Sequence, residues 1–110
     1  MQVSVEFDDK SYSMEVPDNL PQEAQDYFSQ IDRDMDHGWQ MSRWWVPDPD
    51  ETQRCQIVAD KLLTALQQGN EEFAMLMCAY ILYRKPETVR ISLNTDGQIQ
   101  GNQFFQSDPR

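Results

Sequence analysis

The chain has 110 residues, 39% of them hydrophobic and 11% aromatic, and a net charge of −10 at pH 7. This length suits one domain, and the aromatic side chains supply enough apolar surface for a core, which argues against a disordered chain. Residues 1–36 hold ten acidic and two basic residues. Such a field repels nucleic acid and anionic membranes and favours a basic protein partner or cations, although it would equally serve solubility alone.

Neither a signal peptide nor a membrane span is expected. The first ten residues lack a charged region followed by an apolar one, and the longest apolar stretch, residues 73–83, is much shorter than a bilayer-spanning helix. Cys55 and Cys78 fall on helices expected to be antiparallel, where they are offset by about 9 Å along the axis, too far for a disulfide. Buried, reduced thiols predict a cytoplasmic protein.

Alternating apolar residues open the chain. A polar turn, residues 8–11, separates two runs in which every second side chain is apolar: Val3, Val5 and Phe7, then Tyr12, Met14 and Val16. This spacing predicts a β-hairpin with one apolar face. Asp18 or Asn19 can then cap a helix that we expect to end near Asp36, with Gly38 just beyond it.

A second helix is predicted after an extended segment, residues 39–46. Asp48 suits the N-cap, Pro49 the first helical position, and Glu51 the third position of a capping box. The apolar spacing carries this helix to about Gln68.

A third helix, from Glu71 to about Arg84, is apolar almost all round and should be the most buried. Alternation resumes at Val89, and an Asp-Gly pair at positions 96–97 predicts a hairpin that returns along residues 98–105.

The order ββ-α-α-α-ββ predicts an α+β fold. A single hairpin is marginally stable, so we expect the N- and C-terminal hairpins to form one mostly antiparallel sheet packed on the three central helices. Residues 1–110 should form a single domain, in which residues 106–110 are a frayed tail.

Residues 32–46 concentrate the chemically distinctive side chains: all three tryptophans, the only histidine, and Asp32, Asp34 and Asp36. On a helix, Asp32 and Asp36 share a face, and their repulsion together with the helix dipole costs about 1 kcal/mol. Arg33, Arg43, a basic group of a partner, or a divalent cation would relieve this strain. Alternatively, the turn is solvated and the helix unwinds early.

The three aspartates resemble the start of a calcium-binding EF-hand loop, but the resemblance fails. Counting from Asp32, the places of the required glycine and glutamate hold His37 and Arg43. Another oxygen-rich site remains an alternative, with Asp32, Asp34, Asp36 and His37 as metal ligands and Mg²⁺, Mn²⁺ or Ca²⁺ as the ion. The leading interpretation needs no cofactor.

His37 lacks the neighbours that a catalytic histidine requires. The nearest hydroxyl, on Ser42, lies in no recognisable nucleophile motif. A histidine beside a glycine at a helix end also has a simple structural role, because its charged form complements the helix dipole. These residues favour a protein without enzymatic activity.

Trp44 and Trp45 are adjacent, so in an extended segment their side chains point to opposite sides. At least one should be partly exposed; the alternative places Trp44 in the core and Trp45 over a helix edge. Tryptophan and arginine are enriched at interface hot spots, and Arg43 precedes the pair.

The sequence therefore predicts a small acidic domain that binds a protein partner with basic and apolar groups. The predicted contact residues are Asp32, Asp36, Trp39, Arg43, Trp44 and Trp45. A cation-binding or metal-dependent protein is one alternative, and a homodimer closed by the tryptophan segment is another. Neither nucleic acid nor a membrane is an expected partner.

Overall fold

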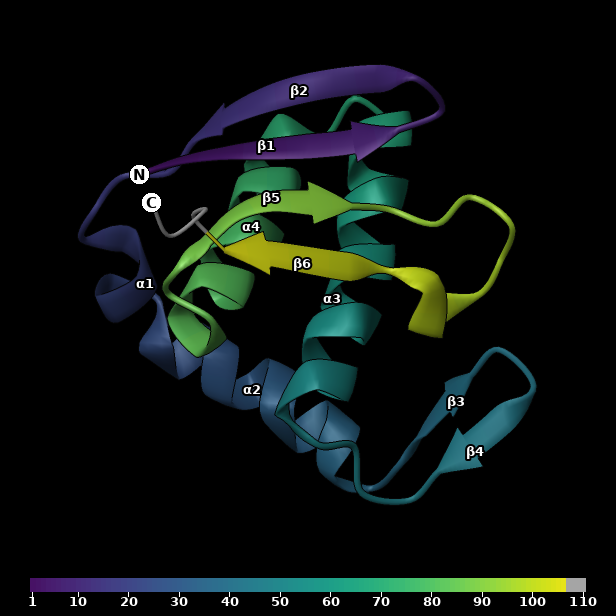
Figure 1. Cartoon of the computed structure of the whole chain (residues 1–110). Helices are drawn as coiled ribbons and strands as arrows, with labels where there is room; N and C mark the ends of the chain where they lie inside the picture. The colour runs from purple at the N-terminus through teal and green to yellow at the C-terminus, as the bar shows by residue number, and fades with distance from the viewer. Residues whose placement is uncertain (107–110) are drawn as a thin grey trace.

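Two hairpins from opposite ends of the chain meet in one four-stranded sheet. The computed structural model describes residues 1–106 (Figure 1). Strand β1 (Gln2–Phe7) pairs antiparallel with β2 (Lys10–Glu15), and β5 (Thr88–Ser92) pairs antiparallel with β6 (Gln103–Gln106). The order is β2-β1-β5-β6, with β1 and β5 parallel at the centre. The predicted α+β fold, with a mostly antiparallel sheet, is confirmed.

The first hairpin turns within two residues. Asp8 and Asp9 both have positive φ angles, 51° and 60°, as the tightest hairpin turns require. The turn was predicted to span residues 8–11, but it consists of Asp8 and Asp9 alone, so β2 already begins at Lys10. The side chains of Val3, Val5 and Phe7 on β1 are buried on one face of the sheet, as their alternation predicted.

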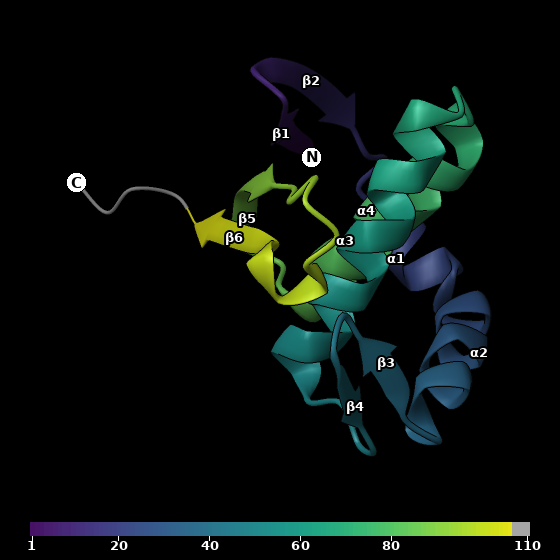
Figure 2. The ribbon, with the colours of Figure 1, turned by 90° about the vertical axis from the view of Figure 1, so that its right-hand side faces the viewer.

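Helices cover this apolar face in two layers. Helix α3 (Glu51–Gln67) and helix α4 (Glu71–Arg84) pack against each other behind the sheet. Helices α1 (Leu20–Glu23) and α2 (Gln25–Asp36) lie on their far side (Figure 2). This arrangement explains the sequence of α4, which is apolar almost all round because it has neighbours on both sides.

Two helices differ from the prediction. The first helix is divided at Ala24, whose backbone leaves the helical region between α1 and α2. Helix α3 starts two residues late: Asp50, not Asp48, is the N-cap, and its capping box is closed by Gln53, not Glu51. The carbonyl of the buried Pro49 instead accepts a hydrogen bond from Arg54 Nε of α3 at 2.9 Å. Asp48 therefore lies outside the helix.

The return strand of the second hairpin is also shorter than predicted. Residues 99–101 form a 3₁₀ turn, η1 (Ile99–Gly101), before β6 begins. The reason is the buried amide of Asn102, which accepts from the Asn94 N–H at 2.7 Å and donates to the Gln56 carbonyl at 3.0 Å. A bulge between Thr88 and Arg90 also breaks the alternation and leaves Val89 40% exposed.

Three further findings concern the remaining expectations. Cys55 and Cys78 are both buried and unbonded. Within residues 1–106, no helix is both long and apolar enough to cross a bilayer. Of the expected frayed tail, Gln106 is the last residue of β6, and residues 107–110 lie outside the described part of the chain.

Candidate functional site

Asp32, on the inner face of α2, sits in a network of hydrogen bonds and ion pairs. The phenol of Tyr80 on α4 donates to Asp32 Oδ1 at 2.5 Å, and Arg84 Nη2, one turn further along α4, lies 2.5 Å from Asp32 Oδ2. The Arg84 Nε donates to the Tyr80 oxygen at 3.3 Å. The Asp32 side chain keeps only 20% of its surface exposed. This carboxylate therefore joins α2 to α4.

Arg54 on α3 completes the network. Its Nη1 donates to the Asp32 carbonyl at 3.1 Å and lies 3.4 Å from Asp32 Oδ1, while its Nη2 donates to Asp36 Oδ1 at 2.8 Å. Asp48 lies 3.6 Å from the same nitrogen. Because the Arg54 side chain is 12% exposed, these contacts take place at the edge of the core.

The predicted strain at the end of α2 is thus relieved inside the molecule. The expected bases were Arg33 and Arg43, but Arg54 and Arg84 provide the positive charge. The helix does not unwind early, because it runs to Asp36, and of its three acids Asp32 is the one withdrawn from solvent. Sequence reasoning missed these partners because they lie 22 and 52 residues from Asp32.

The other proposed metal ligands do not join this cluster. Asp34 is exposed on a different side of α2, beside a small hollow lined in part by Tyr27 and Lys61. His37 is exposed at the helix C-cap. Across residues 1–106, no three His, Cys, Asp or Glu side chains come together in a way that could hold a metal ion.

The tryptophans lie on a separate hairpin. Strands β3 (Trp39–Met41) and β4 (Trp44–Val46) pair antiparallel and project from the helices at the end opposite β2 (Figure 1). Paired residues share a face, so Trp44 lies on the face of Met41, and Trp45 lies on the other face with Gln40.

The hairpin is fixed to the body at several points. Met41 is fully buried, and its carbonyl accepts from Gln100 Nε2 at 2.9 Å. At the turn, the Ser42 hydroxyl donates to the Gly97 carbonyl at 3.1 Å and accepts from the Ile99 N–H at 2.8 Å. The β3–β4 hairpin is therefore held in place by the loop that precedes β6.

Trp39 belongs to this attachment. Its half-buried ring packs against the core, and the Lys61 ammonium lies 4.9 Å from the ring centroid in a cation–π contact. Of the six predicted contact residues, Asp32 and Trp39 are thus largely engaged within the molecule. Asp36 is more exposed but shares Arg54.

The remaining three predicted residues face solvent. Arg43 is exposed at the tip of the β3–β4 hairpin, and Trp44 and Trp45 are 69% and 60% exposed. The alternative that placed Trp44 in the core is wrong. The Trp45 ring lies over Gly38, where a Cβ atom would come 2.4 Å from its Cζ2.

A hollow of about 510 Å³ adjoins Trp44 and Arg43, and its other wall is the loop from Asp96 to Gln100. Acidic side chains dominate the surrounding sequence, with Asp34, Asp36, Asp48 and Asp50 flanking the hairpin, and all four are exposed.

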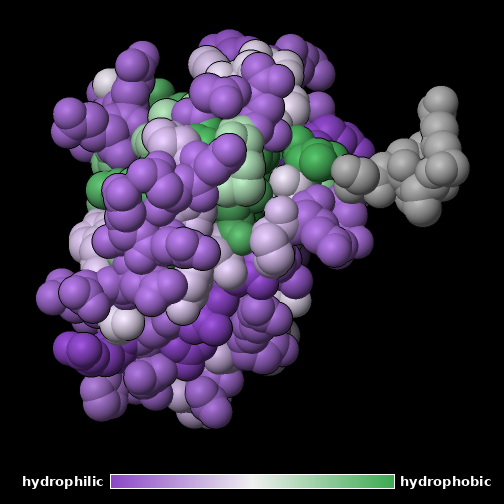
Figure 3. Space-filling model, turned by 90° about the vertical axis from the view of Figure 1, so that its left-hand side faces the viewer, coloured by the Kyte–Doolittle hydropathy of each residue, from purple (hydrophilic) through white to green (hydrophobic). Residues whose placement is uncertain are grey.

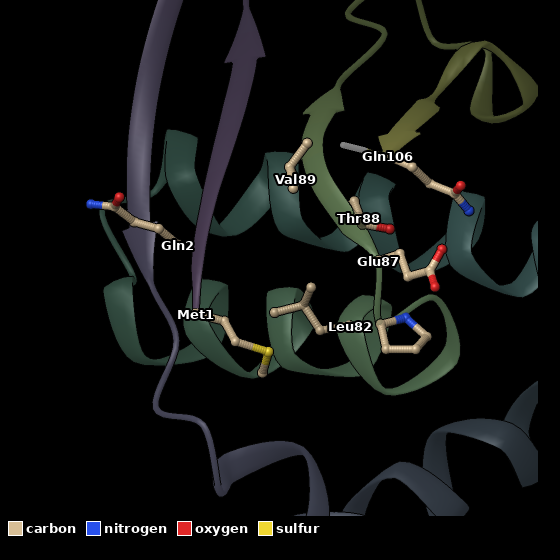
Figure 4. Close-up of a pocket in the computed structure, with 8 residues that line it drawn as sticks. Met1, Gln2, Leu82, Glu87, Thr88, Val89 and Gln106 are labelled. Atoms are coloured by element: carbon tan, nitrogen blue, oxygen red, sulfur yellow. The ribbon is translucent and has the colours of Figure 1, made fainter. Parts of the chain in front are cut away.

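A second apolar area lies on the opposite side of the molecule, where hydrophobic residues show between hydrophilic ones (Figure 3). It is a hollow of about 670 Å³ at the start of β1 and β5. Figure 4 shows Met1 and Leu82 at its floor and Val89 on its β5 side. No predicted site residue lines it.

The chain matches no protein-family model, no curated protein and no solved structure in comparisons with each.

Proposed function

We propose that this protein is a non-enzymatic interaction module, and that the exposed tip of the β3–β4 hairpin binds a protein partner with apolar and basic groups. The observation that carries the proposal is the exposure of two adjacent tryptophans, 69% for Trp44 and 60% for Trp45. Tryptophan is a typical anchor of protein interfaces because it buries a large apolar area at low cost in conformational entropy.

The attachment of the hairpin supports a binding role. Met41 and Ser42 fix the turn of the hairpin to the rest of the domain. The two indoles therefore lie on a preorganised surface. A preorganised surface loses less conformational entropy on binding than a mobile loop does. The indoles point to opposite faces of the hairpin, so a partner that contacts both must enclose the β4 edge.

The charge around the hairpin indicates the kind of partner. The exposed aspartates at positions 34, 36, 48 and 50 flank the hairpin in the sequence, and the whole chain carries −10. A basic partner surface would be steered toward this end, and salt would slow its association. The two buried, unbonded thiols suit a reducing compartment, so we place this interaction in the cytoplasm.

Affinity capture with variant proteins tests the proposal. The wild type and a Trp44→Ala/Trp45→Ala variant are immobilised, and the proteins that they retain from a cell extract are identified and then purified. Val89→Ala is the matched control, because it removes an exposed apolar side chain on the opposite side of the molecule.

A purified protein that binds the wild type and the control, but binds the double variant at least tenfold more weakly, supports the proposal. Its affinity should also fall as salt is raised from 50 to about 300 mM. Equal retention by all three proteins contradicts the proposal.

A further inference from the structure

Among residues 1–106, strand β2 has no neighbour on its outer side. It is one of the two edge strands of the sheet, and Figure 1 draws no helix or strand beyond it. Five of its six residues are exposed, and Met14 is half-buried. Its support comes from pairing with β1, from the contact of Met14 with the core, and from the Tyr12 ring stacked on Phe7 at 5.4 Å.

The backbone of β2 offers a regular row of hydrogen-bonding groups to solvent. The Val16 N–H donates to the Met1 carbonyl at 2.7 Å, and the Met1 amine donates to the Val16 carbonyl at 2.6 Å. In an antiparallel ladder, every second residue bonds to a given neighbour. The even-numbered residues therefore face β1, and Ser11, Ser13 and Glu15 turn their N–H and C=O groups outward.

This edge lacks the usual protection against pairing. Natural edge strands are commonly blocked by a central charge, a proline or a bulge. The register of β1 and β2 is continuous over all six residue pairs. The four central residues, Ser11 to Met14, are uncharged, and the only charges are Lys10 at one end and Glu15 at the other.

We propose that β2 pairs antiparallel with β2 of a second copy of this chain, so that two four-stranded sheets join into one. A two-fold axis perpendicular to the sheet keeps the helices of both copies on the same side, and it requires side chains of the same face to pair. With Ser13 on the axis, Ser11 lies opposite Glu15 of the second copy, and all three outward-facing residues are used.

The side chains of β2 complement themselves in this arrangement. Tyr12, which is 37% exposed, comes to lie opposite the half-buried Met14 of the second copy on the helix side of the sheet. Along β2, no like charges lie directly opposite each other: Lys10 lies opposite Val16 of the second copy, and Glu15 lies opposite Ser11.

Dimerisation through β2 would leave the β3–β4 hairpin free, because this hairpin lies at the other end of the molecule (Figure 1). The dimer would present two pairs of exposed tryptophans and could hold a two-site partner more tightly than one hairpin does. The joint is only six residues long, so we expect a weak dimer that dissociates on dilution in the micromolar range.

Sedimentation equilibrium of the full chain tests this proposal. Between about 1 and 500 µM, the mass should rise from 13.0 kDa toward twice that value. A mass that stays at 13.0 kDa throughout overturns the proposal. The Trp44→Ala/Trp45→Ala variant should dimerise like the wild type, and loss of the dimer in this variant would place the contact at the hairpin instead.

Ser13→Pro distinguishes an effect on dimerisation from an effect on folding. Position 13 donates no hydrogen bond to β1, so proline removes only an outward-facing N–H and is tolerated at an edge. We expect a folded monomer, with the dimer weakened at least tenfold. Ser13→Thr is the matched control, because it keeps the N–H and should dimerise like the wild type. A proline variant that dimerises equally well contradicts the interface.

Cysteine cross-linking tests the register. With Ser13 on the axis, its two Cα atoms lie about 5.5 Å apart, within reach of a disulfide, whereas those of Ser11 lie about 14 Å apart. Oxidised Ser13→Cys should form a covalent dimer and Ser11→Cys should not. The buried native thiols should not interfere. Cross-linking at Ser11 but not Ser13, or at neither position, overturns the arrangement.

Discussion

The end of α2 and the β3–β4 hairpin follow each other in the chain, yet their burial is the reverse of what is usual. A carboxylate of α2 is largely buried, and tryptophan rings of the hairpin are exposed. The Asp32 carboxylate is 20% exposed and contacts Tyr80, Arg54 and Arg84. Trp44, twelve residues later, is 69% exposed. The acids hold helices together, and the aromatic rings face solvent.

The comparison shows which of the two features is available to a partner. A carboxylate that already has charged and neutral donors gains little from an external base, because its interactions are complete. An exposed indole gains the whole of its burial free energy when a partner covers it. We therefore propose that the hairpin recognises the partner, whereas Asp32 and Asp36 connect the helices.

The largest predicted effect is that of Asp32→Asn. The substitution keeps the shape of the side chain but leaves the guanidinium groups of Arg54 and Arg84 without their shared countercharge. We expect the free energy of unfolding to fall by about 3 kcal/mol in urea titration. Asp34→Asn, two residues further along α2 and exposed, is the control and should change the free energy of unfolding by less than about 0.5 kcal/mol. Equal effects would show that Asp32 is not part of a structural network.

The interior groups should also give the protein an alkaline limit. Burial raises the pKa of the Cys55 and Cys78 thiols to about 12, and burial together with the bond to Asp32 raises the pKa of Tyr80. The folded state keeps protons that the unfolded chain releases, so this stability is complete below about pH 8.5 and is lost as pH rises toward 12. Between pH 8 and 9.5, the two thiols together should lower the free energy of unfolding by about 2 kcal/mol.

Urea titrations at several pH values measure this loss. A Cys55→Ala/Cys78→Ala variant should be less stable at neutral pH but should show a flatter pH dependence over the same interval. If the wild type is equally stable at pH 8 and pH 9.5, the thiols are not buried as described.

Gly38→Ala tests the contact between the hairpin and the end of α2. Gly38 has a φ of 101°, and a Cβ there would lie 2.4 Å from the Trp45 ring. We expect a loss of about 1–2 kcal/mol in stability and a shift in tryptophan emission. In a Trp45→Ala background the steric part of this loss should disappear, leaving the cost of the backbone angle. Equal losses in both backgrounds would show that the ring does not lie over Gly38.

The smallest predicted effect on stability is that of removing the exposed rings. Trp44→Ala should lower the free energy of unfolding by less than about 1 kcal/mol, because the ring is 69% exposed. Trp39 is the comparison, since its half-buried ring contacts Lys61 and the core, and Trp39→Ala should cost more. Quenching by acrylamide should likewise be stronger for Trp44 and Trp45 than for Trp39. A larger loss at Trp44 than at Trp39 would reverse the assignment of core and surface.

Local sequence patterns predicted most of the fold. Alternation found β1, β2 and β5, and the all-round apolar run found α4. The errors arose where a tertiary contact competed with a local signal. The buried Asn102 shortened the last strand, and Arg54 holds the Pro49 carbonyl outside the helix that Asp48 was expected to cap.

The candidate site was only partly predictable. Adjacent tryptophans imply that at least one ring is exposed, but the pattern could not show that both are. That outcome depends on how the two-stranded β3–β4 hairpin is held at the end of the molecule, which involves residues far away in the sequence. The partners of Asp32 were out of reach for the same reason. Arg54, Tyr80 and Arg84 carry no local signal that points to α2.

The most direct test of the central claim is a binding titration of the purified partner with three proteins: the wild type, Trp44→Ala/Trp45→Ala, and Asp34→Asn/Asp36→Asn. The hairpin account predicts that the double tryptophan variant binds at least tenfold more weakly, with a free energy of unfolding close to that of the wild type. The aspartate variant should mainly slow association at low salt. Unchanged affinity of the tryptophan variant, or loss of binding only in the aspartate variant, would contradict the account.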